Sequence, residues 1–155
     1  MQNRRVRTGG LFTIGYEGKS LEGYLQELAS AGITLLCDVR RNPVSRKKGF
    51  AKSALAAACA AAGIRYEHVP QLGIASEERK AVRTAADRAA LFERYRWVTL
   101  PRETAAVAQI RRWIEEDGAR VALTCFERDP CECHRHQLAA VLASEGVAGG
   151  HVTDL

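Results

Sequence analysis

A chain of 155 residues is long enough for one domain to bury a hydrophobic core without a structural metal or disulfide. Its composition, 46% hydrophobic and 26% charged, is typical of a globular protein, and no apolar run approaches the ~20 residues needed to cross a bilayer. We therefore expect no membrane-spanning segment and no membrane partner. The basic first ten residues lack the apolar stretch of a signal peptide, which favours a cytoplasmic protein.

The net charge of +5 permits a polyanionic partner without requiring one, and the classes it favours are phosphorylated small molecules and nucleic acid. The five cysteines are an odd number. In a reducing compartment they indicate core thiols, reactive thiols or metal ligands rather than a disulfide framework. We expect no bound cofactor.

Apolar runs of strand length alternate with segments of helical spacing along the chain. The runs lie at residues 11–15, 33–39, 64–69 and 121–125, with a short last strand around 151–152. The helical segments lie at residues 20–32, 52–62, 87–100, 103–117 and 130–145. This alternation predicts an α/β fold, a single Rossmann-like domain over residues 11–155 with a mainly parallel sheet of about five strands and helices on both faces. Residues 1–10 are expected to form a basic, disordered tail.

Two features between these elements carry weaker signals. Residues 75–86 are polar and irregular, and we expect them to be mobile or to form a lid. Pro101 is expected to break the helix that begins at Asp87, because proline lacks the backbone donor that a helix interior needs.

The segment 121–136 holds the densest group of reactive side chains. It predicts a strand ending at Cys125, a charged loop and the start of a helix. In an open parallel sheet, ligands bind where the carboxyl ends of strands face helix N-termini, so we expect the functional site here. Asp129 and Pro130 are typical N-cap and first-turn residues, which predicts that the helix begins at Pro130.

That starting point fixes which side chains face inward. Counting about 100° per residue from Pro130 puts Cys131, His134 and Arg135 on the buried side of the helix and Cys133 on the other side. A buried arginine needs an acidic partner or an anionic ligand. We expect the partner to be Asp38 or Glu127.

The same cluster suggests two kinds of thiol chemistry. A thiol at Cys125, at a strand end beside the cation Arg135 and His134, has the surroundings of a nucleophile. The compact loop of phosphatases and sulfurtransferases, with a cysteine and an arginine six positions later, is absent because Cys125 and Arg135 are ten apart. Four ligand types fall within ten residues, but Cys131 and Cys133 are closer than common zinc spacings, so we predict no metal site.

A second group of charges follows the strand at residues 33–39. The loop after Asp38 and Arg40 contains Pro43, which cannot continue a central strand, and then a basic cluster. The loop therefore belongs to the same sheet edge as Cys125. The candidate anion-binding residues there are Arg40, Ser45, Lys47 and Lys48.

Four segments together resemble one known family. They are TIGYEG (13–18), DVRRNPVSRKKGFAK (38–52), GIRYEHVPQLG (63–73) and CFERDPCECHR (125–135), which are similar to the successive motifs of the domain of unknown function 488 family. The resemblance implies a single α/β domain but no particular activity. The family motifs fall here on Asp38, Arg40, Pro43, Ser45, Cys125, Glu127, Cys133, His134 and Arg135.

The resemblance also bears on details. Cys131 stands where the family pattern varies, and Gly73-Ile74 replaces a more usual glycine pair. The family resemblance also favours Cys133 as a functional residue. For Cys133 to face the site, the helix has to begin only at His134.

Three functional hypotheses follow. The first is a small enzyme acting on a nucleotide or nucleic acid, with anion-binding residues Arg40, Ser45, Lys47, Lys48 and Arg135. Its candidate catalytic residues are Asp38, Cys125, Glu127, Cys133 and His134. The second is a non-catalytic nucleic-acid-binding module using residues 46–52, and the third is a thiol-based metal or redox site.

Overall fold

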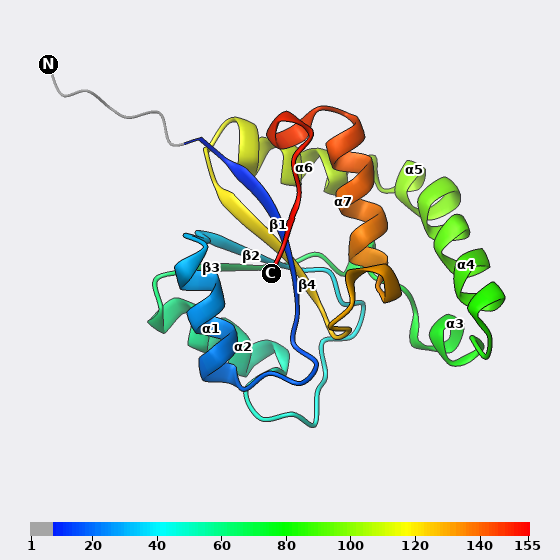
Figure 1. The fold of residues 1–155 in the computed structure, drawn as a ribbon, viewed down its shortest axis with the longest axis horizontal. Coiled ribbons are helices and arrows are strands. Elements are labelled where there is room, and N and C mark those ends of the chain that lie inside the picture. Colours follow the sequence, from blue (N-terminus) through cyan, green and yellow to red (C-terminus); the bar gives the residue numbers. More distant parts are fainter. Residues whose placement is uncertain (1–7) are drawn as a thin grey trace, which may run out of the picture.

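The computed structural model describes residues 8–155. Within them, five strands form one sheet in which every strand pair is parallel. The strand order is β3-β2-β4-β1-β5 (Figure 1). The strands are β1 (Gly10–Gly15), β2 (Leu35–Asp38), β3 (Arg65–His68), β4 (Arg120–Cys125) and β5 (Thr153–Asp154). The predicted α/β fold with a parallel sheet of about five strands is confirmed, and the arrangement is consistent with a Rossmann-like fold. The expected tail falls mainly on residues 1–7, outside the described residues.

Helices cover both faces of the sheet (Figure 1). One face packs against α1 (Leu21–Ser30) and α2 (Lys52–Ala61). The other packs against α6 (Thr104–Glu115) and α7 (His134–Ser144). Side chains of a strand alternate between faces, so Leu11 enters the core on the α6–α7 side and Phe12 the core on the α1–α2 side. This double burial explains the continuously apolar strands of the sequence.

The chain topology places β4 between two strands that precede it. β4 pairs with β1 on one side and β2 on the other, with Cys125 opposite Gly15 and Thr124 opposite Asp38. The carboxyl ends of these three strands therefore meet at one edge of the sheet.

The segment expected to be irregular is largely helical. It contains α3 (Ser76–Lys80), and α4 (Ala85–Arg94) begins at a capping box in which Thr84 and Asp87 each accept from the other's backbone amide. No periodic pattern marks α3 in the sequence because it contains no apolar residue, and the expected mobility or lid role of the segment stays a prediction.

Pro101 does not end the helix before it. The chain continues from α4 through a π-helical turn, Tyr95–Thr99, into α5 (Leu100–Arg102), and turns only at Glu103. Pro101 is the second residue of α5, and the helical stretch ends one residue beyond it at Arg102, so the break expected at the proline comes only after it. Across residues 8–155, none of the helices combines the length and the apolar character that a bilayer span requires.

Candidate functional site

The carboxyl edge of β4 is tied closely to the end of β1. The amide of Tyr16 donates to the carbonyl of Cys125 at 3.3 Å, and the amide of Glu17 to that of Phe126 at 2.8 Å. A Cβ added to Gly15 would lie 1.8 Å from the carbonyl oxygen of Glu127. Only a glycine lets the two backbones approach this closely, so the loop after β4 has a fixed position.

The helix after this loop begins later than the sequence predicts. Asp129 caps only a 3-10 turn, Pro130–Glu132, where its carboxylate accepts from the amide of Cys131 at 2.9 Å. Cys133 is then extended, with φ −128° and ψ 143°, and its Sγ accepts from the amide of Arg135 at 3.5 Å as the N-cap of α7.

The extended residue changes which cysteine faces inward. Cys133 is 1% exposed, whereas Cys131 lies at the surface. The orientation that the helical count predicted for these two cysteines was therefore wrong, because the count assumed an unbroken helix from Pro130, whereas α7 begins at His134, the start that the family resemblance required. The burial predicted for His134 and Arg135 is confirmed.

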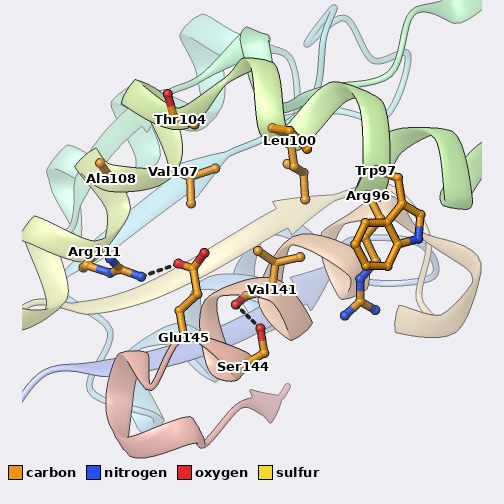
Figure 2. Close-up of a pocket in the computed structure, with 11 residues that line it drawn as sticks. Arg96, Trp97, Leu100, Thr104, Val107, Ala108, Arg111, Val141, Ser144 and Glu145 are labelled. Carbon is orange, nitrogen blue, oxygen red and sulfur yellow. Dashed lines mark hydrogen bonds and ion pairs between the residues drawn. The ribbon is translucent and has the colours of Figure 1, made fainter.

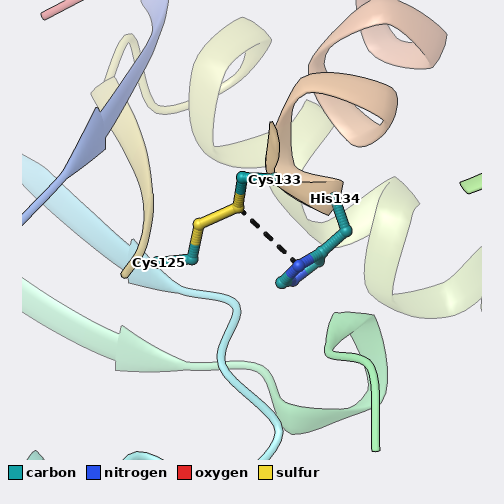
Figure 3. A group of neighbouring side chains, drawn as sticks. All are labelled: Cys125, Cys133 and His134. Atoms are coloured by element: carbon teal, nitrogen blue, oxygen red, sulfur yellow. Dashed lines mark hydrogen bonds between the residues drawn. A yellow bond between two sulfur atoms is a disulfide. The ribbon is translucent and has the colours of Figure 1, made fainter. Parts of the chain in front are cut away.

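Two cysteines and a histidine meet at this edge (Figure 3). Cys125 at the end of β4 and Cys133 at the start of α7 form a disulfide, and their Cα atoms are 7.3 Å apart. His134 Nδ1 lies 3.8 Å from Cys133 Sγ, and its Nε2 lies 2.9 Å from the carbonyl oxygen of Val39. A carbonyl only accepts, so Nε2 carries the proton and Nδ1 presents a lone pair. Burial lowers the pKa of His134 to about 4, which keeps the ring neutral at neutral pH.

Arg135 is the largest fully buried side chain of the described residues. Its Nη1 donates to the carbonyl of Glu127 at 2.6 Å and lies 3.0 Å from Cys125 Sγ, and its Nη2 donates to the carbonyl of Arg128 at 3.3 Å. The expected carboxylate partner was wrong, because backbone carbonyls of the fixed loop accept from Nη1 and Nη2 instead, and the buried Nε has no hydrogen-bond partner. Burial lowers the pKa of Arg135, although nearby acids, Glu127 first among them, act in the opposite direction.

Asp38 and Arg40 form a separate buried ion pair. Arg40 Nε and Nη2 donate to the two carboxylate oxygens at 2.9 and 2.7 Å, and Tyr66 donates to the same carboxylate at 2.5 Å. Arg40 Nη1 also donates to the carbonyl of Phe50 at 2.7 Å, which ties the loop after β2 to the sheet. Burial acts to lower the pKa of Arg40, but the hydrogen bonds and charge of Asp38 outweigh it and raise the pKa.

The basic loop after β2 contributes one ordered lysine. Lys47 donates through Nζ to the carbonyl of Tyr16 at 3.2 Å, and its amide donates to Ser45 Oγ at 3.1 Å. Arg46 and Lys48 are exposed. The loop thus packs on the end of β1 through Lys47 and presents its other cations to solvent.

A pocket of about 240 Å³ opens beside His134. Of the predicted site residues, only Glu127 and His134 line it. Burial raises the pKa of Glu127, although its own backbone amide and the charges of Arg79 and Arg135 act to lower it. The complete lining is Ile74, Arg79, Val82, Arg88, Leu91, Phe92, Glu127, Glu132 and His134.

The pocket includes two arginines that sequence analysis missed, Arg79 on α3 and Arg88 on α4. Arg88 had a usable signal. It lies three and four residues before Leu91 and Phe92, so it shares a helix face with apolar side chains, an unusual place for a cation without a function. Arg79 had none, because α3 is too short to show a period.

A larger groove of about 580 Å³ lies between α5, α6 and α7 (Figure 2). Leu100, Val107 and Val141 give it an apolar floor, and the ion pair of Arg111 with Glu145 closes one side. None of the predicted site residues lines this groove.

Comparison with known proteins confirms the family that the sequence resembles. Residues 20–142 match the family described as Domain of unknown function DUF488. No curated protein and no solved structure matches the chain. Because the match covers well over half of the chain, this protein belongs to the DUF488 family.

Proposed function

We propose that this protein is a small enzyme that binds a phosphate-bearing substrate, either a nucleotide or the end of a nucleic acid. The observation that carries the proposal is the pocket of about 240 Å³ whose lining includes Arg79 and Arg88 together with Glu127 and His134. A pure binding surface needs no buried histidine and half-buried carboxylate beside its cations. Their combination favours catalysis.

The two arginines have donors available for a ligand. Arg79 is exposed at the pocket mouth. The Arg88 side chain is also exposed, and its ion pair with the exposed Glu132 spans 3.8 Å, so the pair is weak. Arg40 and the two Nη groups of Arg135, by contrast, direct their donors at protein atoms. A guanidinium binds a phosphate through two parallel hydrogen bonds, which makes Arg79 and Arg88 the anion-binding residues that the geometry favours.

The pocket volume limits what enters it. Pockets for drug-sized ligands measure about 300–1,000 Å³, so a pocket of about 240 Å³ accepts a phosphate with a small adjoining group and leaves the remainder of a larger substrate outside. Glu127 is half-buried at the lining and is the group that we assign to proton transfer. Cys125 and Cys133 do not line the pocket, and we give them no contact with the substrate.

The test is ligand-dependent thermal stability with inorganic phosphate and with a nucleoside monophosphate as probes. At 100 times its dissociation constant a ligand stabilises the folded state by about 2.7 kcal/mol. This corresponds to a rise in melting temperature of roughly 5–10 °C for a chain of this size. We expect this rise in the parent protein and its loss in Arg79→Gln/Arg88→Gln.

Two controls separate the pocket from general surface charge. Arg83→Gln removes an exposed cation between α3 and α4 that does not line the pocket, and it is expected to keep the full response. The triple glutamine variant of the exposed loop cations is expected to keep it as well. The proposal is overturned if neither probe raises the melting temperature of the parent protein. If only the triple variant loses the response, the loop cations bind the phosphate, and a nucleic-acid-binding module is favoured. The loop cations are Arg46, Lys48 and Lys52.

A further inference from the structure

We infer that Cys125, Cys133 and His134, with both cysteines reduced, bind one Zn²⁺ ion. Their ligand atoms all lie within 4.8 Å of one another, and all three side chains are buried. This inference goes beyond the proposed function and does not depend on it. The sequence argument against a metal rested on the short spacing of Cys131 and Cys133, whereas the structure pairs Cys133 with Cys125 and leaves Cys131 at the surface.

The backbone spacing of the cysteines suits a shared metal ion. Their Cα atoms are 7.3 Å apart. Disulfides usually join Cα atoms about 4.4–6.8 Å apart, so this pair is wide for a disulfide. Two thiolates on one tetrahedral Zn²⁺, each about 2.3 Å from the metal, leave their sulfur atoms roughly 3.8 Å apart. A wider pair of cysteines fits this longer bridge.

His134 is already oriented as a metal ligand. Its Nε2–H group donates to the carbonyl of Val39 at 2.9 Å, which fixes the tautomer and the plane of the ring. The remaining lone pair, on Nδ1, lies 3.8 Å from Cys133 Sγ. Histidines that bind metals almost always donate their other ring N–H in this way, commonly to a backbone carbonyl. Val39 therefore serves as the outer partner of the site.

Two donors of Arg135 lie beside the sulfur atoms. Arg135 Nη1 lies 3.0 Å from Cys125 Sγ, and the Arg135 amide donates to Cys133 Sγ at 3.5 Å. Such donors stabilise a bound thiolate. Two thiolates and an imidazole select zinc over hard cations such as Mg²⁺ and Ca²⁺, which prefer oxygen ligands.

Three protein ligands leave one position of a tetrahedral zinc open, as in catalytic rather than structural sites. His134 belongs both to this set and to the lining of the pocket, so the open position is expected on the pocket side. Glu127, which also lines the pocket, has its Oε2 3.4 Å from Cys125 Sγ.

The bound form requires reduction of the cysteine pair. The disulfide takes two electrons and two protons from a dithiol reductant, which is itself oxidised to a disulfide, and two thiols form. Zn²⁺ then displaces the two thiol protons as the zinc–sulfur bonds form. Oxidation of the pair thus excludes the metal.

The experiment uses the full chain, reduced and then freed of reductant under anaerobic conditions, with Co²⁺ as a spectroscopic probe and Zn²⁺ as its competitor. We expect one Co²⁺ per chain, with thiolate-to-cobalt charge-transfer absorption and the visible bands of four-coordinate cobalt, and their loss on adding Zn²⁺. Cys133→Ser and His134→Gln are expected to weaken binding by ~100-fold or more, at least as much as the loss of an outer partner does. The matched control Cys131→Ser, which removes an exposed cysteine two residues away, keeps the affinity.

A second measurement needs no variant and so does not depend on the variants folding. Zn²⁺ is expected to protect Cys125 and Cys133, but not Cys131, from alkylation in the parent chain, as mapped by mass spectrometry. Absence of a stoichiometric cobalt spectrum, or binding that Cys131→Ser abolishes, overturns the inference. Neither result bears on phosphate binding, which is measured without added metal.

Discussion

Replacing Asp38 with Asn tests whether the ion pair at the end of β2 holds the fold or serves the substrate. Asp38 is 0% and Arg40 6% exposed, and the guanidinium makes two hydrogen bonds to the carboxylate. Asp38→Asn leaves a buried guanidinium without its counter-charge. Removing one partner of a buried pair destabilises a protein by about 3–5 kcal/mol.

Urea denaturation measures this loss. With a slope of about 2 kcal/mol/M for a domain of this size, the midpoint is expected to fall by roughly 1.5–2.5 M. The matched control is Glu67→Gln on the neighbouring strand β3, whose pair with Arg65 is largely exposed and contributes about 1 kcal/mol or less. Asp38→Asn/Arg40→Met, which removes both charges, is expected to regain much of the stability because no uncompensated charge remains.

The outcome distinguishes two roles for Asp38. Neither Asp38 nor Arg40 lines the pocket, so the stabilisation by phosphate is expected to persist in Asp38→Asn where the variant is folded. A loss of stability no larger than that of Glu67→Gln, together with loss of the phosphate response, would refute the structural role and return Asp38 to the substrate site.

Two further substitutions test the edge of β4. Arg135→Met is expected to lower the unfolding free energy by about 2–4 kcal/mol, measured by thermal denaturation. Two carbonyls lose a charged donor, and relief of the buried charge offsets only part of that loss. An unchanged melting temperature in anion-free buffer would show instead that the guanidinium is held for a ligand. Gly15→Ala places a Cβ 1.8 Å from the carbonyl oxygen of Glu127 and is expected to destabilise by about 1–3 kcal/mol or more. The control is Gly23→Ala in α1, where the nearest atom to an added Cβ is the Ser20 hydroxyl oxygen at 3.2 Å. Its unfolding free energy is expected to stay within about 1 kcal/mol of the parent. Equal effects of the two glycine variants would contradict the close approach at Gly15.

Local patterns determined most of the fold. Continuous apolar runs predicted the parallel strands, and the helical segment expected at residues 20–32 contains α1, whose N-cap Ser20 accepts from the amide of Gly23 three residues later. The same reasoning brought Cys125, His134 and Arg135 to one edge, because a strand end and the following helix start are joined by a short loop. These features depend on neighbours in the sequence, and short-range rules describe such neighbours well.

Only the tertiary structure decided how distant segments meet. The position of β4 between β1 and β2, the partners of Arg135 and the entry of Arg79 and Arg88 into the pocket all join residues far apart or from separate elements. The start of α7 also belongs here, because Asp129 and Pro130 satisfy a 3-10 turn as well as an α-helix. In the structure α7 begins only at His134, and Cys133 just before it is extended and buried. Local signals that two structures satisfy equally leave that choice to packing, and here packing sets which cysteine faces His134.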